Sequence, residues 1–199
     1  RAHAAWQAER ERVRAGGGVP SLRVVTATEH AAIGAVPGAE VAVESVGAPR
    51  PRPHGKRFGT LVHAVLAAVE LDAGRAGVAD TAALHGRLLG ATAEEVAAAV
   101  DTAVRALAHP LLRRAADAAR AGRCRRECPV GVQVEGGVLV EGVIDAAFLE
   151  DGEGWTVVDF KTDVEIAGRL EEYRGQVALY AEAVGQATGM RARGVLLRV

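Results

Sequence analysis

The hydrophobic pattern of this chain has a helical period in its first half and a strand period in its second half. Over residues 57–71 apolar side chains recur at helical spacing, which predicts a helix with Thr60 as its N-cap. A capping box at Thr92–Glu95 predicts the start of another helix. This helix should end before His109-Pro110, because the residue before a proline is disfavoured in a helix, and a further helix should follow.

From residue 128 onwards apolar and polar residues alternate with a period of two, which is typical of strands. We expect strands over 128–135, 138–148 and 155–160, joined as consecutive hairpins by glycine-rich turns. A helix over 169–188 and a final strand over 194–199 complete the pattern. This order of helices and strands predicts an α/β fold.

The N-terminal quarter of the chain lacks a firm period over most of its length. We expect a helix over 2–15, ended by three glycines, and a strand over 22–28. We therefore interpret residues 1–54 as an arm or linker and residues 55–199 as the folded domain. Because the chain starts with Arg1 rather than Met, we expect it to be part of a longer protein.

Composition narrows the class of protein. The chain has 199 residues, of which 49% are hydrophobic and 25% charged, as expected of a globular domain. A formal net charge of −1 gives no support for nucleic-acid binding, so that function must rest on local groups. No apolar run reaches the roughly 18 residues of a membrane span, so we expect no membrane partner. Two cysteines are too few for an iron–sulfur cluster, and we expect reduced thiols of a cytoplasmic protein.

The segment from Val157 to Asp163 carries the first candidate chemistry. Side chains alternate along a strand, so Asp159 and Lys161 should share one face and Phe160 should point to the other. Lysine supplies only two of the 24 basic residues, and its ammonium is a compact charge that can shift its pKa. A surface ion pair at the end of an ordinary strand is the alternative interpretation.

A second acid, Asp145, precedes Asp159 by fourteen residues across the predicted hairpin. Opposed side chains of antiparallel strands are about 5 Å apart, and two carboxylates at that distance repel unless a cation lies between them. Their oxygens suit Mg²⁺ or Mn²⁺, and Lys161 would orient or deprotonate a water beside the ion. The alternative is two acids on a solvated hairpin face, although both follow apolar runs.

Three further features have both a functional and a structural interpretation. Gln176 and Tyr180 share a helix face that can reach the site. His63 lies beside the apolar stripe of its helix, where a histidine is more often structural than a ligand. The arginine cluster over residues 113–126 can meet phosphates or form a solvated face.

Taken in order, four motifs resemble the RecB-type nuclease domain of the PD-(D/E)XK superfamily, as found at the C-terminus of AddA- or RecB-like helicase–nucleases of the UvrD family. The resemblance covers residues 55–199. The motifs are Gly59-Thr60-Leu61-Val62-His63, Gly142-Val143-Ile144-Asp145, Asp159-Phe160-Lys161-Thr162-Asp163 and Gln176-Val177-Ala178-Leu179-Tyr180. The fold it implies is a restriction-endonuclease-like core, a central mixed sheet flanked by helices.

The resemblance also implies roles for individual residues. His63, Asp145, Asp159 and the backbone carbonyl of Phe160 would hold Mg²⁺, with Mn²⁺ as a substitute. Lys161 would be the catalytic lysine beside the two acids. The catalytic and DNA-binding residues implied on the last motif are Gln176 and Tyr180.

The same resemblance implies a function and its partners. We expect a metal-dependent deoxyribonuclease acting on single-stranded DNA, within an ATP-dependent helicase–nuclease of recombinational double-strand-break repair. Its partners would be the helicase domains of the same polypeptide and an AddB- or RecC-like second subunit, near the bacterial nucleoid. The alternative is a catalytically inactive nuclease-like module that binds DNA or docks a partner protein, since a fold does not dictate activity.

Overall fold

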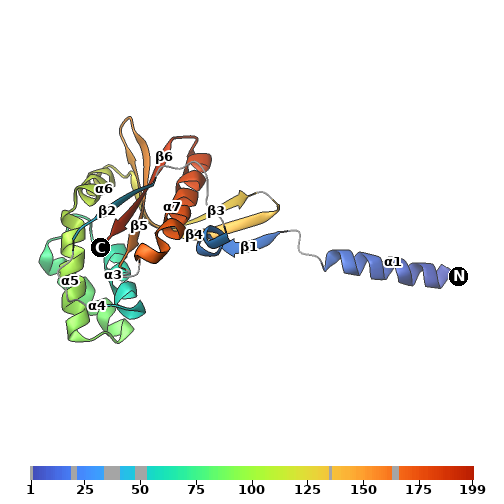
Figure 1. The fold of residues 1–199 in the computed structure, drawn as a ribbon, viewed down its shortest axis with the longest axis horizontal. Coiled ribbons are helices and arrows are strands. Elements are labelled where there is room, and N and C mark those ends of the chain that lie inside the picture. The colour runs from blue at the N-terminus through green and yellow to red at the C-terminus, as the bar shows by residue number, and fades with distance from the viewer. Residues whose placement is uncertain (1, 19–21, 34–40, 48–52, 135, 163–165) are drawn as a thin grey trace.

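The structure is a computed structural model that describes residues 2–18, 22–33, 41–47, 53–134, 136–162 and 166–199 (Figure 1). The helices are α1 (Ala2–Gly17), α2 (Ala27–Ile33), α3 (Lys56–Ala68), α4 (Arg75–Leu89), α5 (Ala93–Ala108), α6 (Pro110–Arg120) and α7 (Ile166–Thr188). The strands are β1 (Arg23–Thr26), β2 (Val41–Ser45), β3 (Cys124–Val134), β4 (Val138–Glu150), β5 (Gly154–Lys161) and β6 (Ala192–Arg198).

The strands form one mixed sheet in the order β1-β4-β5-β6-β2, with β3 paired to the remaining edge of β4. The hairpin partners β3, β4 and β5 are antiparallel, as the alternating pattern predicts. Strand β6 runs parallel to β5, because α7 carries the chain back across the sheet. The expected mixed sheet flanked by helices is therefore confirmed.

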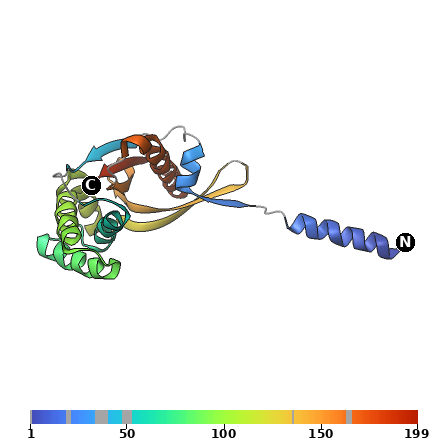
Figure 2. The same ribbon diagram turned by 60° about the horizontal axis from the view of Figure 1, so that its bottom comes forward.

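Helices cover both faces of the sheet (Figures 1 and 2). On one face α3, α4, α5 and α6 form a cluster with residues of the sheet such as Phe148 and Phe160. On the other face α7 covers Val157 and Leu196, which belong to two smaller clusters. Helix α1 has no buried residue and lies away from the rest of the chain in Figure 1.

Both halves of the capping box are present at the start of α5, as predicted. The hydroxyl of Thr92 accepts from the backbone of Glu95, whose carboxylate accepts from the backbone of Thr92. The predicted cap of α3 is wrong, because that helix begins earlier, after Gly55. Thr60 lies within the helix and donates to the carbonyl of Lys56 at 2.9 Å. The buried ring of Phe58 draws this first turn onto the core.

Two parallel strands lie within the segment interpreted as an arm. Strand β1 pairs with β4, and β2, which the sequence pattern does not predict, pairs with β6. The reason is that β2 is a short edge strand whose only fully buried side chain is Val41, so it has no clear alternation. The division of the chain at residue 54 stays a prediction, and residues 23–26 and 41–45 complete the sheet.

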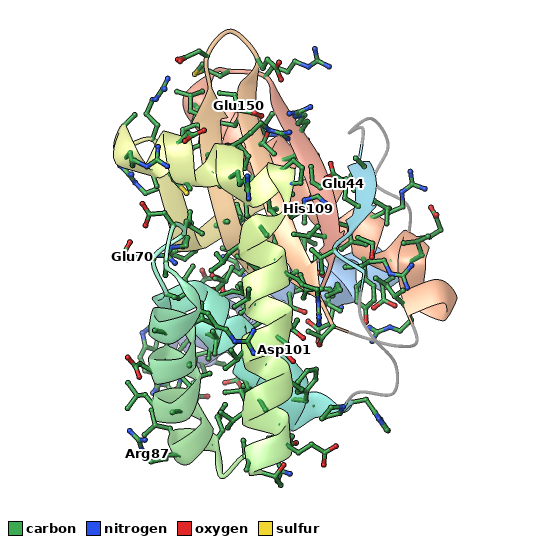
Figure 3. The ribbon with its side chains drawn as sticks, turned by 90° about the vertical axis from the view of Figure 1, so that its left-hand side faces the viewer. Glu44, Glu70, Arg87, Asp101, His109 and Glu150 are labelled. Carbon is green, nitrogen blue, oxygen red and sulfur yellow. The ribbon has the colours of Figure 1, made fainter. Side chains whose placement is uncertain are left out.

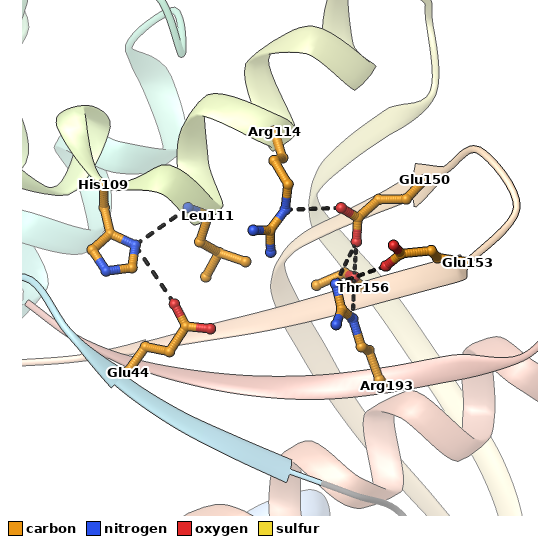
Figure 4. A network of polar contacts seen from close by, with 8 residues as sticks. All are labelled: Glu44, His109, Leu111, Arg114, Glu150, Glu153, Thr156 and Arg193. Carbon is orange, nitrogen blue, oxygen red and sulfur yellow. Dashed lines mark hydrogen bonds and ion pairs between the residues drawn. The ribbon is translucent and has the colours of Figure 1, made fainter.

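A polar network fastens α6 to the sheet at the end remote from the Asp145–Asp159 pair (Figures 3 and 4). Glu150, at the end of β4, accepts from Thr156 at 2.5 Å and from Arg193 of β6 at 2.8 Å. Its second oxygen lies 2.8 Å from Nε of Arg114 on α6. Because Thr156 is fully buried, this network satisfies a hydroxyl that would otherwise lack a partner.

Candidate functional site

The candidate site lies where β4 and β5 separate. Their ladder ends with Ala146 opposite Val158, and one further step in the same register sets Asp145 opposite Asp159. Strand β5 continues to Lys161, paired only with β6. The structure therefore brings the two acids into the cross-strand relation that the hairpin predicts.

The carboxylate of Asp145 connects three parts of the chain. Its Oδ2 accepts from the backbone N–H of Phe160 at 2.6 Å, in the place where the ladder to β5 has ended. Its Oδ1 lies 3.3 Å from Nδ1 of His63 on α3. The ring of Phe160 also meets the His63 ring edge-on, with 6.2 Å between centroids.

Asp159 and Lys161 form a close ion pair on the α7 side of β5. Oδ2 of Asp159 is 2.5 Å from Nζ of Lys161, and among the described residues this oxygen has no partner with regular hydrogen-bond geometry. The side chain of Asp159 is 4% exposed and that of Lys161 17% exposed. Phe160, between them, joins the core on the opposite face, as the alternation predicts.

Burial and charge shift the pKa of both acidic and basic groups here. Burial raises the pKa of Asp159 to about 6, with the charge of Asp145 acting in the same direction and Lys161 opposing it. Burial lowers the pKa of His63, but its hydrogen bond to Asp145 and the charge of that carboxylate outweigh burial and raise the pKa. The site is thus a coupled set of two acids with one imidazole and one ammonium.

Strand β4 changes phase at Asp145. Ile144 and Ala147 both belong to the cluster under α7, whereas Ala146 belongs to the cluster on the opposite face. On the neighbouring strand, Glu127 would pair with Asp145 in the β3–β4 register, yet this pair is missing from the ladder. Glu127 has φ 48°, a value that non-glycine residues rarely adopt. The irregularity turns Asp145 out of the alternation and toward His63.

Glu127 is a site residue that the sequence analysis missed. Partial burial and the charge of Asp145 raise the pKa of the Glu127 carboxyl above its ordinary value. The strand was predicted to begin at Cys128, whereas β3 begins at Cys124, so this acid lay just outside the predicted element. Backbone strain of this kind collects at functional sites, and the sequence offers no signal for it.

Helix α7 contributes a buried polar pair. Nε2 of Gln176 donates to Oη of Tyr180 at 2.9 Å, and the two side chains are 9% and 3% exposed. The ring of Tyr180 lies against Gly142 of β4, so closely that a Cβ there would be 2.4 Å from Oη. Burial raises the pKa of Tyr180, and the charges of Asp159 and Asp145 add to the effect. This pair fixes α7 on β4, and its contact with DNA stays a prediction.

The four motifs contact one another in space. Gly142 provides the room for Tyr180, and Gly59 of α3 faces Thr162, whose Oγ1 would be 2.8 Å from a Cβ at residue 59. His63, one turn along α3, meets Asp145. Glycines separated by 83 residues therefore serve the same purpose, which is close approach of a helix to the strand end that carries the acids.

The arginine cluster is largely engaged within the chain. Among the described residues, Arg114, Arg120 and Arg123 form ion pairs with carboxylates. Arg126 donates to Leu66 and Val69 carbonyls at the end of α3, and Arg125 donates to nearby backbone carbonyls. These contacts favour a structural face over a phosphate-binding surface.

The donors present suit a divalent cation, although their side chains are not closely gathered. No group of three or more His, Cys, Asp or Glu side chains in the described part of the chain is arranged as a metal centre. Two opposed carboxylates, a raised pKa at Asp159 and a buried oxygen of Asp159 without regular hydrogen bonding are nevertheless the electrostatic conditions that a hard cation relieves. The His63, Asp145 and Asp159 side chains fit such an ion.

Comparison with known proteins identifies the family. Residues 41–199 match the PD-(D/E)XK nuclease superfamily. The chain belongs to this superfamily. The mixed sheet with helices on both faces is consistent with the restriction-endonuclease-like core of PD-(D/E)XK nucleases, and these nucleases generally use divalent metals.

Two curated relatives share part of this nuclease domain, and both are the A subunit of an ATP-dependent helicase/nuclease. The relative from Carboxydothermus hydrogenoformans is 46% identical over 61 residues, covering 28% of this chain and 5% of that protein. The relative from Desulforamulus reducens is 42% identical over 55 residues, covering 26% of this chain and 4% of that protein. The match thus spans about a twentieth of each relative. None of the helices in the described residues has the length and apolarity to cross a membrane.

Proposed function

We propose that this domain is a metal-dependent deoxyribonuclease that hydrolyses phosphodiester bonds of a single DNA strand. The observation that supports it most is the pair Asp145–Asp159 with Lys161 beside it, at the separation of two strands in a PD-(D/E)XK nuclease fold. Each residue type matches the chemistry of phosphate hydrolysis, which needs a cation-binding site and a positioned proton carrier.

The acids and the histidine would hold Mg²⁺, with Mn²⁺ as a substitute. Asp145 and Asp159 offer carboxylate oxygens, His63 offers its imidazole, and the Phe160 carbonyl would complete the protein ligands. When bound, the cation supplies Lewis acidity at the scissile phosphate. The backbone N–H of Phe160 fixes the orientation of Asp145, because it occupies the oxygen that does not face His63.

Lys161 has the role of catalytic lysine in this proposal. Its ammonium is held against Asp159 at the site, where it orients a water or a phosphate oxygen by hydrogen bonding. Gln176 and Tyr180 keep α7 seated on β4, so that the two strands meet α7 in one geometry. The products would carry a 5′ phosphate and a 3′ hydroxyl.

Cleavage of a short labelled single strand at low salt tests this function. We expect cutting with Mg²⁺, none with EDTA, and none in Asp159→Ala or Lys161→Ala while the circular dichroism spectrum is kept. Lys56→Ala is the matched control, because Lys56 is the other lysine of the chain and lies exposed at the start of α3. Undiminished cutting by either site variant would refute the roles, and no cutting or metal binding by the wild type would favour an inactive module.

The names of the relatives support a wider context for this domain. We infer that it belongs to an ATP-dependent helicase–nuclease acting in recombinational repair, in which helicase domains deliver the strand and a second protein of the complex takes part. A net charge near zero is in keeping with delivery by neighbouring domains, since phosphate affinity depends on clustered basic groups. Adding the helicase part should raise the cleavage rate of the isolated domain.

A further inference from the structure

The ammonium of Lys161 has an aromatic partner besides Asp159. Its Nζ lies 5.0 Å from the ring centroid of Tyr173, a buried residue of α7. A cation within about 6 Å of a ring face is attracted by the negative potential of that face, and more strongly where water is excluded. Because Lys161 and Tyr173 are 17% and 6% exposed, this contact is largely shielded from solvent.

The ring of Tyr173 is itself held by its own helix. The guanidinium carbon of Arg169, one turn earlier, lies 4.9 Å from the same centroid. Arg169 is in turn fixed by Glu172, with Nε and NH2 at 2.9 Å and 2.5 Å from its carboxylate oxygens. The ring thus belongs to a series of contacts that leads from the surface of α7 to the ammonium of Lys161.

We propose that Tyr173 is a positioning residue that holds the ammonium of Lys161 against Asp159 through the face of its ring. This inference rests on the proposed function, because it gives the purpose of the contact. A lysine side chain has four flexible carbons, so an ion pair with one oxygen leaves its head free to swing around that oxygen. A ring at a fixed place supplies the second restraint that limits this swing.

The position of Tyr173 is also visible in the sequence. Residues 173, 176 and 180 are spaced i, i+3 and i+7, which places Tyr173 on the helix face of Gln176 and Tyr180. The three residues are buried against the strands that carry the acids. Gln176 and Tyr180 contact β4, and Tyr173 reaches the end of β5.

The contact can be tested without relying on activity, because the chain has only two lysines. A carbon–proton NMR correlation spectrum of the lysine ε-methylene groups should contain one signal from Lys161 and one from exposed Lys56. We expect the Lys161 protons to be shifted upfield by the ring in the wild type and in Tyr173→Phe, and to approach those of Lys56 in Tyr173→Leu. A Lys161 signal that ignores Tyr173→Leu would overturn the proposal.

Its catalytic consequence is tested by replacing Tyr173 with phenylalanine carrying zero, one, two or three ring fluorines. Fluorine weakens the negative face of the ring while hardly changing its volume. We expect kcat to fall stepwise by about tenfold across the series, with KM and the melting temperature unchanged. A flat kcat across the series would show that the ring only packs, and would contradict the proposal. If the wild type does not cleave DNA, the proposed function fails and the contact loses its catalytic purpose, whereas the NMR shift still reports whether the contact exists.

Discussion

Replacing Gly142 by alanine should destabilise the domain through one clash with Tyr180. A Cβ at residue 142 would lie 2.4 Å from Oη, 2.5 Å from Cε1 and 2.8 Å from Cζ of that ring. Carbon atoms in contact are about 3.5–4.0 Å apart, so the ring must move by roughly 1 Å. Tyr180 is 3% exposed and accepts from Gln176 at 2.9 Å, so any movement strains the packing and weakens this hydrogen bond.

The size of the effect follows from these two losses. Overpacking a core costs about 1–3 kcal/mol and a lost hydrogen bond about 1 kcal/mol, while replacing glycine stabilises by about 0.4–1 kcal/mol through the unfolded chain. The net loss in the free energy of unfolding should be about 2 kcal/mol. With a slope of roughly 2 kcal/mol/M in urea, the midpoint should fall by about 1 M.

A matched control lies on the neighbouring strand. In Gly131→Ala the new Cβ would be 3.6 Å from Cδ1 of Leu139, an ordinary contact, so stability should change by less than about 0.5 kcal/mol. In a Tyr180→Leu background the cost of Gly142→Ala should largely disappear, because the clashing ring is gone. Equal stability of Gly142→Ala and Gly131→Ala, or an undiminished cost in the Tyr180→Leu background, would refute this account of the motif.

Three further predictions concern other parts of the molecule. Glu150→Ala should lower the free energy of unfolding by about 2 kcal/mol in urea titrations, because it leaves Thr156 and the paired arginines without their acceptor. Burial raises the pKa of Glu150, but hydrogen bonds from Thr156 and Arg193 outweigh burial and hold that pKa below its ordinary value. The stabilisation should therefore be present above the unfolded pKa and be lost as pH falls through the folded pKa, so the difference between wild type and Glu150→Ala should narrow on acidification; a constant difference would contradict it. Thr92→Ala should cost about 1 kcal/mol through loss of the capping box, whereas Thr188→Ala, near the end of α7, should cost less in the same urea titration.

The sequence predicted elements whose burial is regular and missed those whose burial is not. The hairpin β4–β5 and helix α7 follow periods of two and 3.6, and the pairing of Asp145 with Asp159 is a direct consequence of that hairpin. Strand β2 was missed because parallel pairing to β6 along one edge leaves no alternation to detect.

The candidate site was predictable in its residues and less so in their supports. Asp159 and Lys161 share a face because a strand alternates, which the sequence states directly. The phase change at Asp145 depends on Glu127 at positive φ, a tertiary effect that no local pattern encodes. Tyr173 shares the helical face of Gln176, yet only the packing of α7 on β5 shows that its ring meets Lys161.

The central claim of this account is that Asp145 and Asp159 bind one catalytic cation. Anomalous diffraction from a crystal soaked in Mn²⁺ tests it most directly. The account predicts one peak within about 2.0–2.3 Å of an oxygen of each carboxylate, with His63 as a further ligand. A peak that leaves out either aspartate, or no peak at the site at Mn²⁺ concentrations that support cleavage, would contradict it.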